Sequence, residues 1–364
     1  MNYKPLIVIA AGGTGGHMFP AQALAEEMLK RGWQIKLSTD PRGARYAGNF
    51  PEKVVVEVVN ASTFAHGGIK AKLLTPFLIL RGFFTAYLSM LNERPTIVVG
   101  FGGYPAVPAM LAAGVLKIPR VLHEQNGILG RVNKVFAKSV QAVACGTWPT
   151  DLPKGVVGRH TGNPVRSSVY KQAGSQYIPP GNWPISLLVI GGSQGSTIIA
   201  ESTVNAIALL PESMRANLRV ACQTRGPDID KITKSFIKLG IDAEIQSFFT
   251  DIPRRISQAQ LIISRSGASS IADISVIGRP SILIPYAAAT SDHQNINAHG
   301  LVAANAAVVI QENALNAKVL ADCILKILSS AADAAKMATS ALAKGKPEAA
   351  FELADLVEGI AQNE

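Results

Sequence analysis

Six residues near the amino terminus, GGTGGH (Gly12 to His17), constrain this fold more than any other stretch. They follow the apolar run Leu6 to Ala11 and precede a helical pattern from Pro20 to Arg31. A strand, a glycine turn and a helix in this order present backbone N–H groups to an anion, most often a phosphate. Four glycines in five positions cost chain entropy, so a tight turn or a close ligand approach is expected. A plain connection between strand and helix is the alternative.

The same order of elements recurs in the second half of the chain. An apolar run from Ile185 to Ile190 precedes the glycine-rich stretch Gly191 to Ser196, and a helical pattern spans Ile198 to Leu210. Other short apolar runs alternate with helical stretches in both halves, which is typical of parallel, doubly wound sheets. At 364 residues the chain is too long for a single ordinary core. We therefore predict two α/β domains joined by the glycine- and proline-rich stretch from Val156 to Asn182.

Composition disfavours several classes of protein. Hydrophobic residues make up 48% of the chain and charged residues 16%, which is typical of a globular protein with a large core. The net charge of +10 suits nucleic acid, an anionic membrane surface or a phosphorylated substrate. Aromatic residues are only 6% and do not alternate with basic ones, so no nucleic-acid partner is expected. Three scattered cysteines support neither a disulfide framework nor a metal knuckle, and the first apolar run is too short for a signal peptide, so a cytoplasmic protein is expected.

The stretch from Ile69 to Leu91 is unusually apolar, above all from Leu73 to Phe84. Lys70 and Lys72 precede this run, and Arg81 lies inside it. A central arginine is expensive in a transmembrane helix, so we predict an amphipathic segment that meets a membrane surface. A helix packed into the core is the alternative.

Polar and glycine-rich loops follow the predicted strands. In the first half these loops are Gly12 to His17, which we call the opening loop, Gly102 to Tyr104 and His123 to Asn126. In the second half, Arg265 to Ser269 is another such loop. Ligands of open α/β sheets bind beyond the carboxyl ends of the strands, so these loops are expected to form the walls of a site.

The glycine loops do not match the best-known nucleotide motifs. A dinucleotide fingerprint starting at Gly13 fails because Met18 replaces its last glycine, and neither loop carries the lysine of an ATPase phosphate loop. Asp40, at the end of the second predicted strand, keeps a nicotinamide enzyme open as an alternative. No spacing of His, Cys or Glu indicates zinc, so no obligatory cofactor is expected, although a divalent cation stays open without an evident site. The remaining interpretation is a nucleotide-diphosphate pocket that stabilises a departing diphosphate during group transfer.

Seven short motifs occur in order along the chain. They are GGTGGH (Gly12 to His17), GGY (Gly102 to Tyr104), HEQN (His123 to Asn126), GNPVR (Gly162 to Arg166), GGSQG (Gly191 to Gly195), RSGA (Arg265 to Ala268) and DHQ (Asp292 to Gln294). In order and spacing they resemble the motifs of the bacterial MurG family, glycosyltransferase family 28, over nearly the whole chain. One short glycine motif would be weak evidence, whereas seven in order are specific.

The resemblance implies a GT-B fold, an α/β architecture in which two Rossmann-like parallel-sheet domains face each other across a cleft. It implies an acceptor- and membrane-binding domain over residues 1–165, completed by a C-terminal helix at 347–364, and a UDP-GlcNAc-binding domain over residues 166–346. The implied enzyme is an inverting N-acetylglucosaminyltransferase. It moves GlcNAc from UDP-GlcNAc to the 4-hydroxyl of MurNAc in lipid I (undecaprenyl-diphosphate-MurNAc-pentapeptide) and forms lipid II for peptidoglycan. Such an enzyme acts peripherally at the cytoplasmic face of the plasma membrane, where other cell-wall synthesis proteins are candidate partners.

The resemblance also implies which residues bind the donor. Contacts to UDP-GlcNAc are expected from Thr14, Gly15, Gly16, Asn126, Arg166, Ser193 and Gln294; the backbone of Phe249 falls at the uracil, and Ala268, Ser269 and Ser270 face the diphosphate. Asp273 stands where the family has a ribose-binding glutamate, which is one methylene longer. Asn295 stands where some relatives have a second glutamine, so its contact with the donor sugar stays open.

A general base must remove the proton of the attacking hydroxyl. His17 is the first candidate because an imidazole titrates near neutral pH and lies at the mouth of the opening loop, and Glu124 is the second. Hydrogen bonding to the loop or to the acceptor diphosphate is the alternative for His17. Other functions stay open: another UDP-sugar enzyme of this architecture, such as a glycolipid glycosyltransferase or a UDP-GlcNAc 2-epimerase; a non-catalytic nucleotide-sugar-binding partner of a cell-wall complex; and the nicotinamide enzyme.

Overall fold

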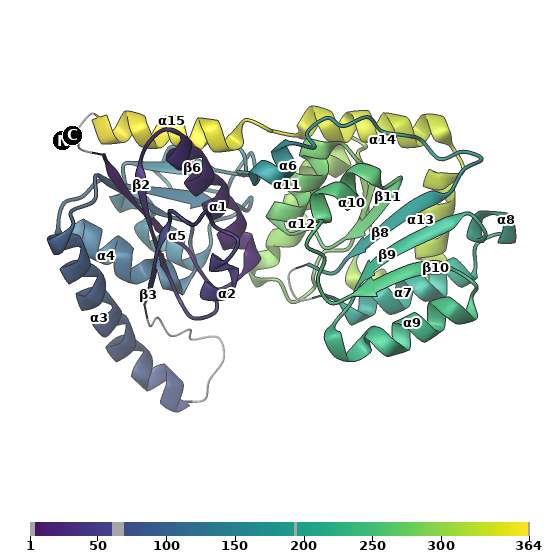
Figure 1. Ribbon diagram of the computed structural model, residues 1–364, viewed down its shortest axis with the longest axis horizontal. Helices are drawn as coiled ribbons and strands as arrows, with labels where there is room; N and C mark the ends of the chain where they lie inside the picture. The colour runs from purple at the N-terminus through teal and green to yellow at the C-terminus, as the bar shows by residue number, and fades with distance from the viewer. Residues whose placement is uncertain (1–3, 60–68, 193–194, 363–364) are drawn as a thin grey trace. The chain divides into compact units, whose positions relative to one another are not determined.

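A computed structural model describes residues 4–59, 69–192 and 195–362 of the chain (Figure 1). The chain divides into two compact units. Unit 1 comprises Met1–Ser167 together with Glu348–Glu364, and unit 2 comprises Ser168–Pro347. The last segment of the chain therefore returns to the unit in which the chain began.

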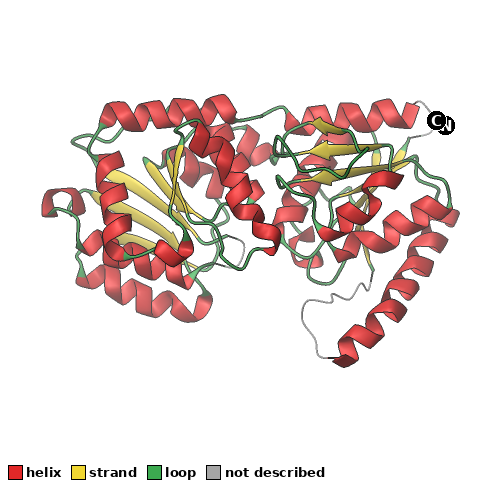
Figure 2. Ribbon diagram, turned by 180° about the vertical axis from the view of Figure 1, so that it is seen from behind, coloured by secondary structure: helices red, strands yellow, loops and turns green. Residues whose placement is uncertain are grey.

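Unit 1 is built on one parallel sheet of seven strands in the order β3-β2-β1-β4-β5-β6-β7. The strands are β1 (Leu6–Ala10), β2 (Gln34–Thr39), β3 (Val55–Val58), β4 (Ile97–Gly100), β5 (Arg120–Glu124), β6 (Ala142–Cys145) and β7 (Gly158–His160). The helices are α1 (Gly15–Lys30), α2 (Ala44–Ala47), α3 (Ile69–Asn92), α4 (Val107–Val115), α5 (Arg131–Phe136) and α15 (Ala349–Gln362), with α6 (Ser167–Tyr170) at the junction with unit 2. Helices flank the strands of this sheet (Figure 2).

Each face of this sheet has its own core because successive strand residues point to opposite faces. Ile7 belongs to a cluster that includes residues of α1 and α15, whereas its neighbour Val8 belongs to a cluster that includes residues of α3, α4 and α5. Leu353 and Val357 of α15 are fully buried in the first cluster. A strand buried on both faces reads as a continuous apolar run, which is the pattern that marked β1 in the sequence.

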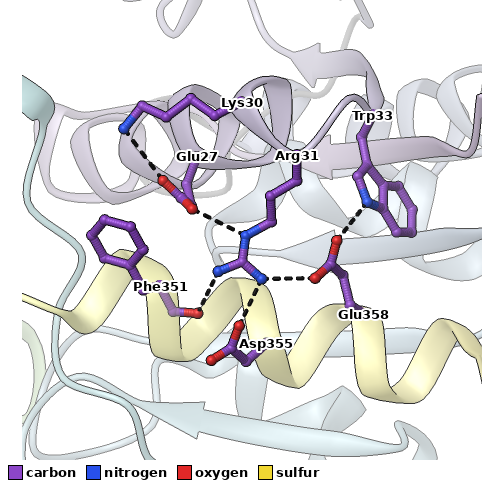
Figure 3. A network of polar contacts seen from close by, with 7 residues as sticks. All are labelled: Glu27, Lys30, Arg31, Trp33, Phe351, Asp355 and Glu358. Atoms are coloured by element: carbon purple, nitrogen blue, oxygen red, sulfur yellow. Dashed lines mark hydrogen bonds and ion pairs between the residues drawn. The ribbon is translucent and has the colours of Figure 1, made fainter.

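A polar network fastens α15 to α1 along the rim of that core (Figure 3). The Arg31 guanidinium donates to Glu27 (3.0 Å), Asp355 (2.6 Å) and Glu358 (2.7 Å). The Trp33 indole N–H also donates to Glu358, at 2.9 Å. Burial alone would lower the pKa of Arg31, but its hydrogen bonds to the three carboxylates outweigh burial and raise the pKa above its ordinary value. The C-terminal helix is thus an integral part of unit 1.

Unit 2 is built on a parallel sheet of six strands in the order β10-β9-β8-β11-β12-β13. The strands are β8 (Ile185–Ile190), β9 (Leu218–Gln223), β10 (Asp242–Gln246), β11 (Leu261–Ser264), β12 (Ser281–Leu283) and β13 (Ala307–Val309). The helices are α7 (Thr197–Ala208), α8 (Glu212–Arg215), α9 (Ile229–Lys238), α10 (Ile252–Gln258), α11 (Ala268–Ile277), α12 (His293–Ala303), α13 (Ala317–Leu328) and α14 (Ala331–Lys344). In both units the first strand is central and the chain winds outwards from it in both directions. The prediction of parallel, doubly wound sheets in both halves is confirmed.

Two local predictions are wrong. The first helix begins at Gly15 and not at Pro20, because an early proline removes only one hydrogen bond and its fixed φ suits a helix. The predicted linker from Val156 to Asn182 also contains β7, which pairs with β6 at the edge of the sheet of unit 1. A strand of three residues that begins with a glycine has no periodicity that the sequence could reveal.

Helix α3 covers the predicted amphipathic stretch, and its side chains are described from Leu78 onward. Lys70, Lys72 and the side chains of residues 73–77 lie outside the described residues. Leu80, Phe84, Leu88 and Leu91 are about half exposed, at 52%, 52%, 57% and 51%. Of the helices in the described ranges, none combines the length and apolarity needed to cross a bilayer.

Candidate functional site

The glycine-rich motifs lie at the topological switch point of each sheet. In unit 1 the switch point lies between β1 and β4, which are followed by Gly12 to Thr14 and by Phe101 to Gly103. In unit 2 it lies between β8 and β11, which are followed by the described glycine-loop residues 191–192 and 195–196 and by Arg265 to Gly267. Ligands of doubly wound sheets bind at this position, where neighbouring strands lead the chain away in opposite directions.

The Asp40 side chain fixes the backbone of the opening loop through a hydrogen bond. Its carboxylate accepts hydrogen bonds from the Gly13 N–H (3.0 Å), the Gly43 N–H (2.8 Å) and the Arg42 Nε (3.0 Å), and the residue is 1% exposed. A Cβ on Gly12 would lie 2.8 Å from Asp40 Oδ1, so only glycine fits beside this carboxylate. Asp40 therefore shapes the loop, and its buried oxygens are unsuited to the ribose role that a nicotinamide enzyme requires.

The opening loop runs directly into the first turn of α1. Thr14 is extended, with φ −139° and ψ 162°, and Gly15 and Gly16 are the first helical residues. Their N–H groups have no acceptor within the helix, as at every helix N-terminus, and the helix dipole favours an anion there. This backbone has the geometry of the predicted anion seat, and binding of a phosphate there stays a prediction.

His17 lies half-buried on the first turn of α1. Its Nδ1 is 3.2 Å from the Gly12 carbonyl oxygen, so this nitrogen carries the proton and donates it. The lone pair of a neutral imidazole then belongs to Nε2, which is the atom that a general base uses. Gly103 of the GGY motif lies beside the ring, since a Cβ there would be 3.4 Å from His17 Cε1. The structure thus brings together His17 and the loop that follows β4.

Glu124 has both carboxylate oxygens engaged and is 1% exposed. Oε1 accepts from the Asn126 N–H (3.1 Å) and from Asn126 Nδ2 (2.9 Å). Oε2 accepts from the Gly130 N–H (2.8 Å) and from Asn133 Nδ2 (2.9 Å). A carboxylate with four donors is suited to orienting the Asn126 side chain. The geometry favours that role for Glu124 over the role of a base.

His123 precedes Glu124 on β5 and is fully buried. Its Nε2 lies 3.2 Å from the Gly162 carbonyl oxygen, and Gln125 Nε2 donates to its Nδ1 at 3.2 Å. Burial lowers the pKa of His123 to about 4, because the opposing effect of the hydrogen bond to Gly162 is smaller. The ring is neutral near pH 7 and joins the loop after β5 to the GNPVR motif.

Arg265 organises the corresponding region of unit 2. This buried guanidinium donates to Ser196 Oγ (3.2 Å), to the Ile284 carbonyl (3.2 Å) and to Glu312 (2.7 Å). Burial alone would raise the pKa of Glu312, but hydrogen bonds from the Ala287 N–H and Arg265 outweigh burial and lower it. The RSGA motif marked Arg265, but nothing in the sequence pointed to Glu312 as its partner, 47 residues away.

The predicted diphosphate residues begin α11. Gly267 is the extended N-cap, and Ala268, Ser269 and Ser270 form the first turn. Among the described residues, the buried hydroxyls of Ser266 and Ser269 have no hydrogen-bond partner. Buried hydroxyls without partners are uncommon, and a polar ligand at this helix N-terminus would satisfy them. The predicted ribose residue Asp273 lies one turn further along the helix and is 8% exposed.

The other predicted donor residues of unit 2 lie on neighbouring loops. Phe249 follows β10 and is 2% exposed, and the Arg255 guanidinium lies 4.1 Å from the centre of its ring. Gln294 Oε1 accepts from the Tyr286 N–H at 3.0 Å. The Asn295 amide already donates to Asp292 (2.6 Å) and accepts from Gln311 (2.8 Å). Ser193 lies outside the described residues.

In unit 1, the last predicted donor residue is Arg166, whose guanidinium lies 4.2 Å from the centre of the Phe19 ring on α1. No group of three or more His, Cys, Asp or Glu side chains in the described ranges is arranged to hold a metal ion.

Comparisons with known proteins agree with this architecture. The structure resembles a crystal structure of Acinetobacter baumannii MurG with a TM-score of 0.77 and 26% identity, covering 98% of this chain and 100% of that one. It also resembles a putative UDP-N-acetylglucosamine 2-epimerase from Listeria monocytogenes with a TM-score of 0.70, but at 12% identity, which shows a common fold alone. Two Rossmann-like units with ligand loops at their switch points define the GT-B class of proteins.

Sequence comparison identifies the family within that class. The glycosyltransferase family 28 N-terminal domain matches residues 7–145, and the glycosyltransferase family 28 C-terminal domain matches residues 186–353. A UDP-N-acetylglucosamine--N-acetylmuramyl-(pentapeptide) pyrophosphoryl-undecaprenol N-acetylglucosamine transferase from Chelativorans sp. (strain BNC1) is 41% identical over 98% of this chain and 96% of its own length. A protein of the same name from Sinorhizobium fredii is 43% identical over the same shares. The chain belongs to glycosyltransferase family 28.

Proposed function

We propose that this protein transfers GlcNAc from UDP-GlcNAc to the 4-hydroxyl of MurNAc in lipid I, with inversion, and so forms lipid II for peptidoglycan synthesis. The observation that carries the proposal is the identity of 41–43% to two transferases of that name over 98% of the chain. The glycine-rich loops at both switch points support it, because ligands of doubly wound sheets bind at that position.

The donor is assigned to two sets of residues, one in each unit. In unit 2, Phe249 receives the uracil, Asp273 the ribose and the first turn of α11 the diphosphate, and Ser193 and Gln294 add further contacts. In unit 1, the donor contacts are Thr14, Gly15, Gly16, Asn126 and Arg166. The helix N-terminus at Ala268 stabilises the leaving diphosphate increasingly as the glycosidic bond breaks, because its negative charge grows.

His17 is the general base in this proposal. Its Nδ1–H is held by the Gly12 carbonyl, so Nε2 takes the proton of the MurNAc hydroxyl as that oxygen attacks the anomeric carbon. Glu124 holds Asn126 in place with two of its four hydrogen bonds. No obligatory cofactor is part of the proposal, and activity in the presence of EDTA checks this point.

Membrane docking is assigned to the exposed stripe of α3, which consists of Leu80, Phe84, Leu88 and Leu91. These residues repeat every three or four positions and therefore lie along one side of the helix. Arg81 is exposed beside them and suits an anionic surface. Because lipid I remains in the bilayer, an enzyme that uses it must work at the cytoplasmic membrane face.

The direct test is an incubation with labelled UDP-GlcNAc and a lipid I analogue, followed by detection of the disaccharide product. We expect labelled product only when both substrates are present. Release of UDP without the acceptor would instead indicate an epimerase or a hydrolase, and transfer to another glycolipid but not to lipid I would contradict the acceptor assignment.

A further inference from the structure

Phe19, on the second turn of α1, is held on more than one side. A Cβ on Gly15 would lie 2.9 Å from the Phe19 ring, so the ring packs against the backbone of the opening loop. The Tyr46 ring meets it edge-on, with centroids 5.8 Å apart. The Arg166 guanidinium lies 4.2 Å from its centroid, within the range of a favourable cation–π contact. One aromatic ring therefore connects the opening loop to Arg166.

Glu26 lies two turns further along the same side of α1. Its Oε2 accepts from the Ser167 N–H (2.7 Å) and from Ser167 Oγ (2.5 Å). Its Oε1 accepts from Gln22 Nε2 at 2.7 Å, which fixes the carboxylate on the helix. Glu26 thus fastens the residue that follows Arg166, while Phe19 contacts the Arg166 side chain itself.

These two contacts bear on ligand binding because an arginine side chain has many rotamers. Ordering such a side chain at the moment of binding costs conformational entropy, and ordering it in advance strengthens binding. Ser167 is also the last residue of unit 1, so the chain leaves this unit directly after the Glu26 contact. The hydrogen bonds of Ser167 to Glu26 therefore restrain the backbone of Arg166, even if the chain after Ser167 moves.

We infer that Phe19 and Glu26 are positioning residues that hold Arg166 ready for UDP-GlcNAc beside the opening loop. The inference rests on the proposed function, in which Arg166 contacts the donor. Neither residue needs to touch the substrate. Their effect is transmitted through Arg166, and it concerns the donor and not the acceptor.

The test compares Phe19→Leu, Glu26→Ala and Glu26→Gln in the full-length protein. We expect Phe19→Leu and Glu26→Ala each to raise KM and Kd for UDP-GlcNAc roughly three- to tenfold, with kcat and KM for a lipid I analogue nearly unchanged. Glu26→Gln keeps one carbonyl acceptor for Ser167 and should lie between wild type and Glu26→Ala. Glu201→Ala is the matched control, since it removes a helical glutamate that pairs with Lys231 in unit 2.

A double-mutant cycle gives the decisive result. In an Arg166→Ala background, Phe19→Leu should raise Kd for UDP-GlcNAc no further, because its effect passes through the missing guanidinium. An equal rise in both backgrounds, or an unchanged Kd in Phe19→Leu alone, would overturn the inference. A variant with a lower kcat, a lower melting temperature and unchanged KM values for both substrates would also overturn the inference. That combination indicates a purely structural defect.

Calorimetric Kd values need no acceptor and separate this inference from the proposed function. If the unchanged protein binds UDP-GlcNAc but makes no disaccharide, the proposed reaction is wrong while the positioning of Arg166 is still decided by the cycle. If the unchanged protein does not bind UDP-GlcNAc, both are overturned.

Discussion

Glu124 and His17 differ at the level of single atoms. Each oxygen of Glu124 already accepts two hydrogen bonds, and three of the four come from Asn126 and Asn133. Proton uptake there would break contacts that shape the loop after β5. The ring of His17 is instead oriented through Nδ1, which places its lone pair on Nε2. Of the two predicted bases, the geometry favours His17.

Replacement of His17 tests the base directly. We expect His17→Ala to lower kcat by roughly 10²–10⁴-fold, because proton removal by a positioned base contributes about that much. Kd for UDP, measured by calorimetry, should stay close to that of wild type. Near-normal turnover in a folded variant would remove His17 from the base role. A loss of UDP binding of similar size would indicate a binding role instead.

His123 makes stability depend on pH. Its pKa is lowered to about 4 by burial, so between the ordinary value of 6.5 and about 4 the unfolded chain binds the extra proton. Stability is therefore complete above about pH 6.5 and falls as pH decreases towards 4. The loss at about pH 5 should be about 2 kcal/mol, measured by urea unfolding.

The matched variant is His123→Gln, which cannot take up a proton in this range. It is expected to be less stable at neutral pH, because buried partners lose a hydrogen bond, but to have a flatter profile between about pH 7 and pH 5. An equally steep profile in the variant would show that other groups cause the acid sensitivity.

The sequence identified most of these residues but not how they interact. Asp40 stood out only as a possible ribose ligand, whereas it hydrogen-bonds Gly13, 27 positions away. Asn133, which supports Glu124, belongs to no motif and sits on a short helix with no polar pattern. Hydrogen bonds between distant positions are set by the fold, so motif spacing cannot reveal them.

At the scale of elements, α3 shows what periodicity can and cannot predict. The apolar stretch predicts a helix that meets either a membrane or the core, and α3 has one exposed and one buried side. The buried side confirms the core packing, and the membrane role of the exposed side stays a proposal. Phe83 packs against the core beneath α3, whereas Phe84 is 52% exposed. Neighbouring residues on a helix face about 100° apart, so a run of apolar residues does not reveal which of them meet a neighbour.

Substitution of the exposed stripe tests its role in docking. We expect Leu80, Phe84 and Leu88, all changed to serine, to weaken binding to anionic vesicles at least tenfold, because each side chain would otherwise bury apolar surface in the interface. The control changes three exposed apolar residues of unit 2, Leu209, Ile237 and Ile178, to serine. Equal vesicle binding by the two folded variants in a sedimentation assay would contradict the docking assignment.

Element boundaries were less predictable than element types. The sequence predicts a start of the opening helix at Pro20, because proline usually marks a helix start, but α1 begins five residues earlier and Pro20 lies inside it. This error matters for function, since the true start puts Gly15, Gly16 and His17 on the first turn. Glycine stretches are ambiguous in sequence because the same residues serve turns and ligand-binding helix starts.

At the scale of the whole molecule, unit 1 is discontinuous in sequence while unit 2 is continuous. Unit 1 needs Glu348–Glu364 to complete one of its two cores. The family resemblance implies a C-terminal helix that completes this unit, and the burial of Leu353, Leu356 and Val357 in its core explains why the helix returns to it. Unit 2 contains the complete sheet β8 to β13 and its own core. The two units are therefore expected to differ in their dependence on the tail.

This difference leads to a prediction about local unfolding. Leu353→Ser combined with Val357→Ser removes two fully buried side chains from the face of the sheet shared with α1. We expect unit 1 to lose about 4 kcal/mol or more, while unit 2 keeps its stability. Hydrogen exchange should then show lower protection at the amides of β1 and β4, and unchanged protection at those of β8 and β11.

The exposed substitution Gln362→Ser on the same helix serves as the control. Equal loss of protection in both sheets would mean that the units unfold together, and no loss in either would mean that α15 adds little to unit 1.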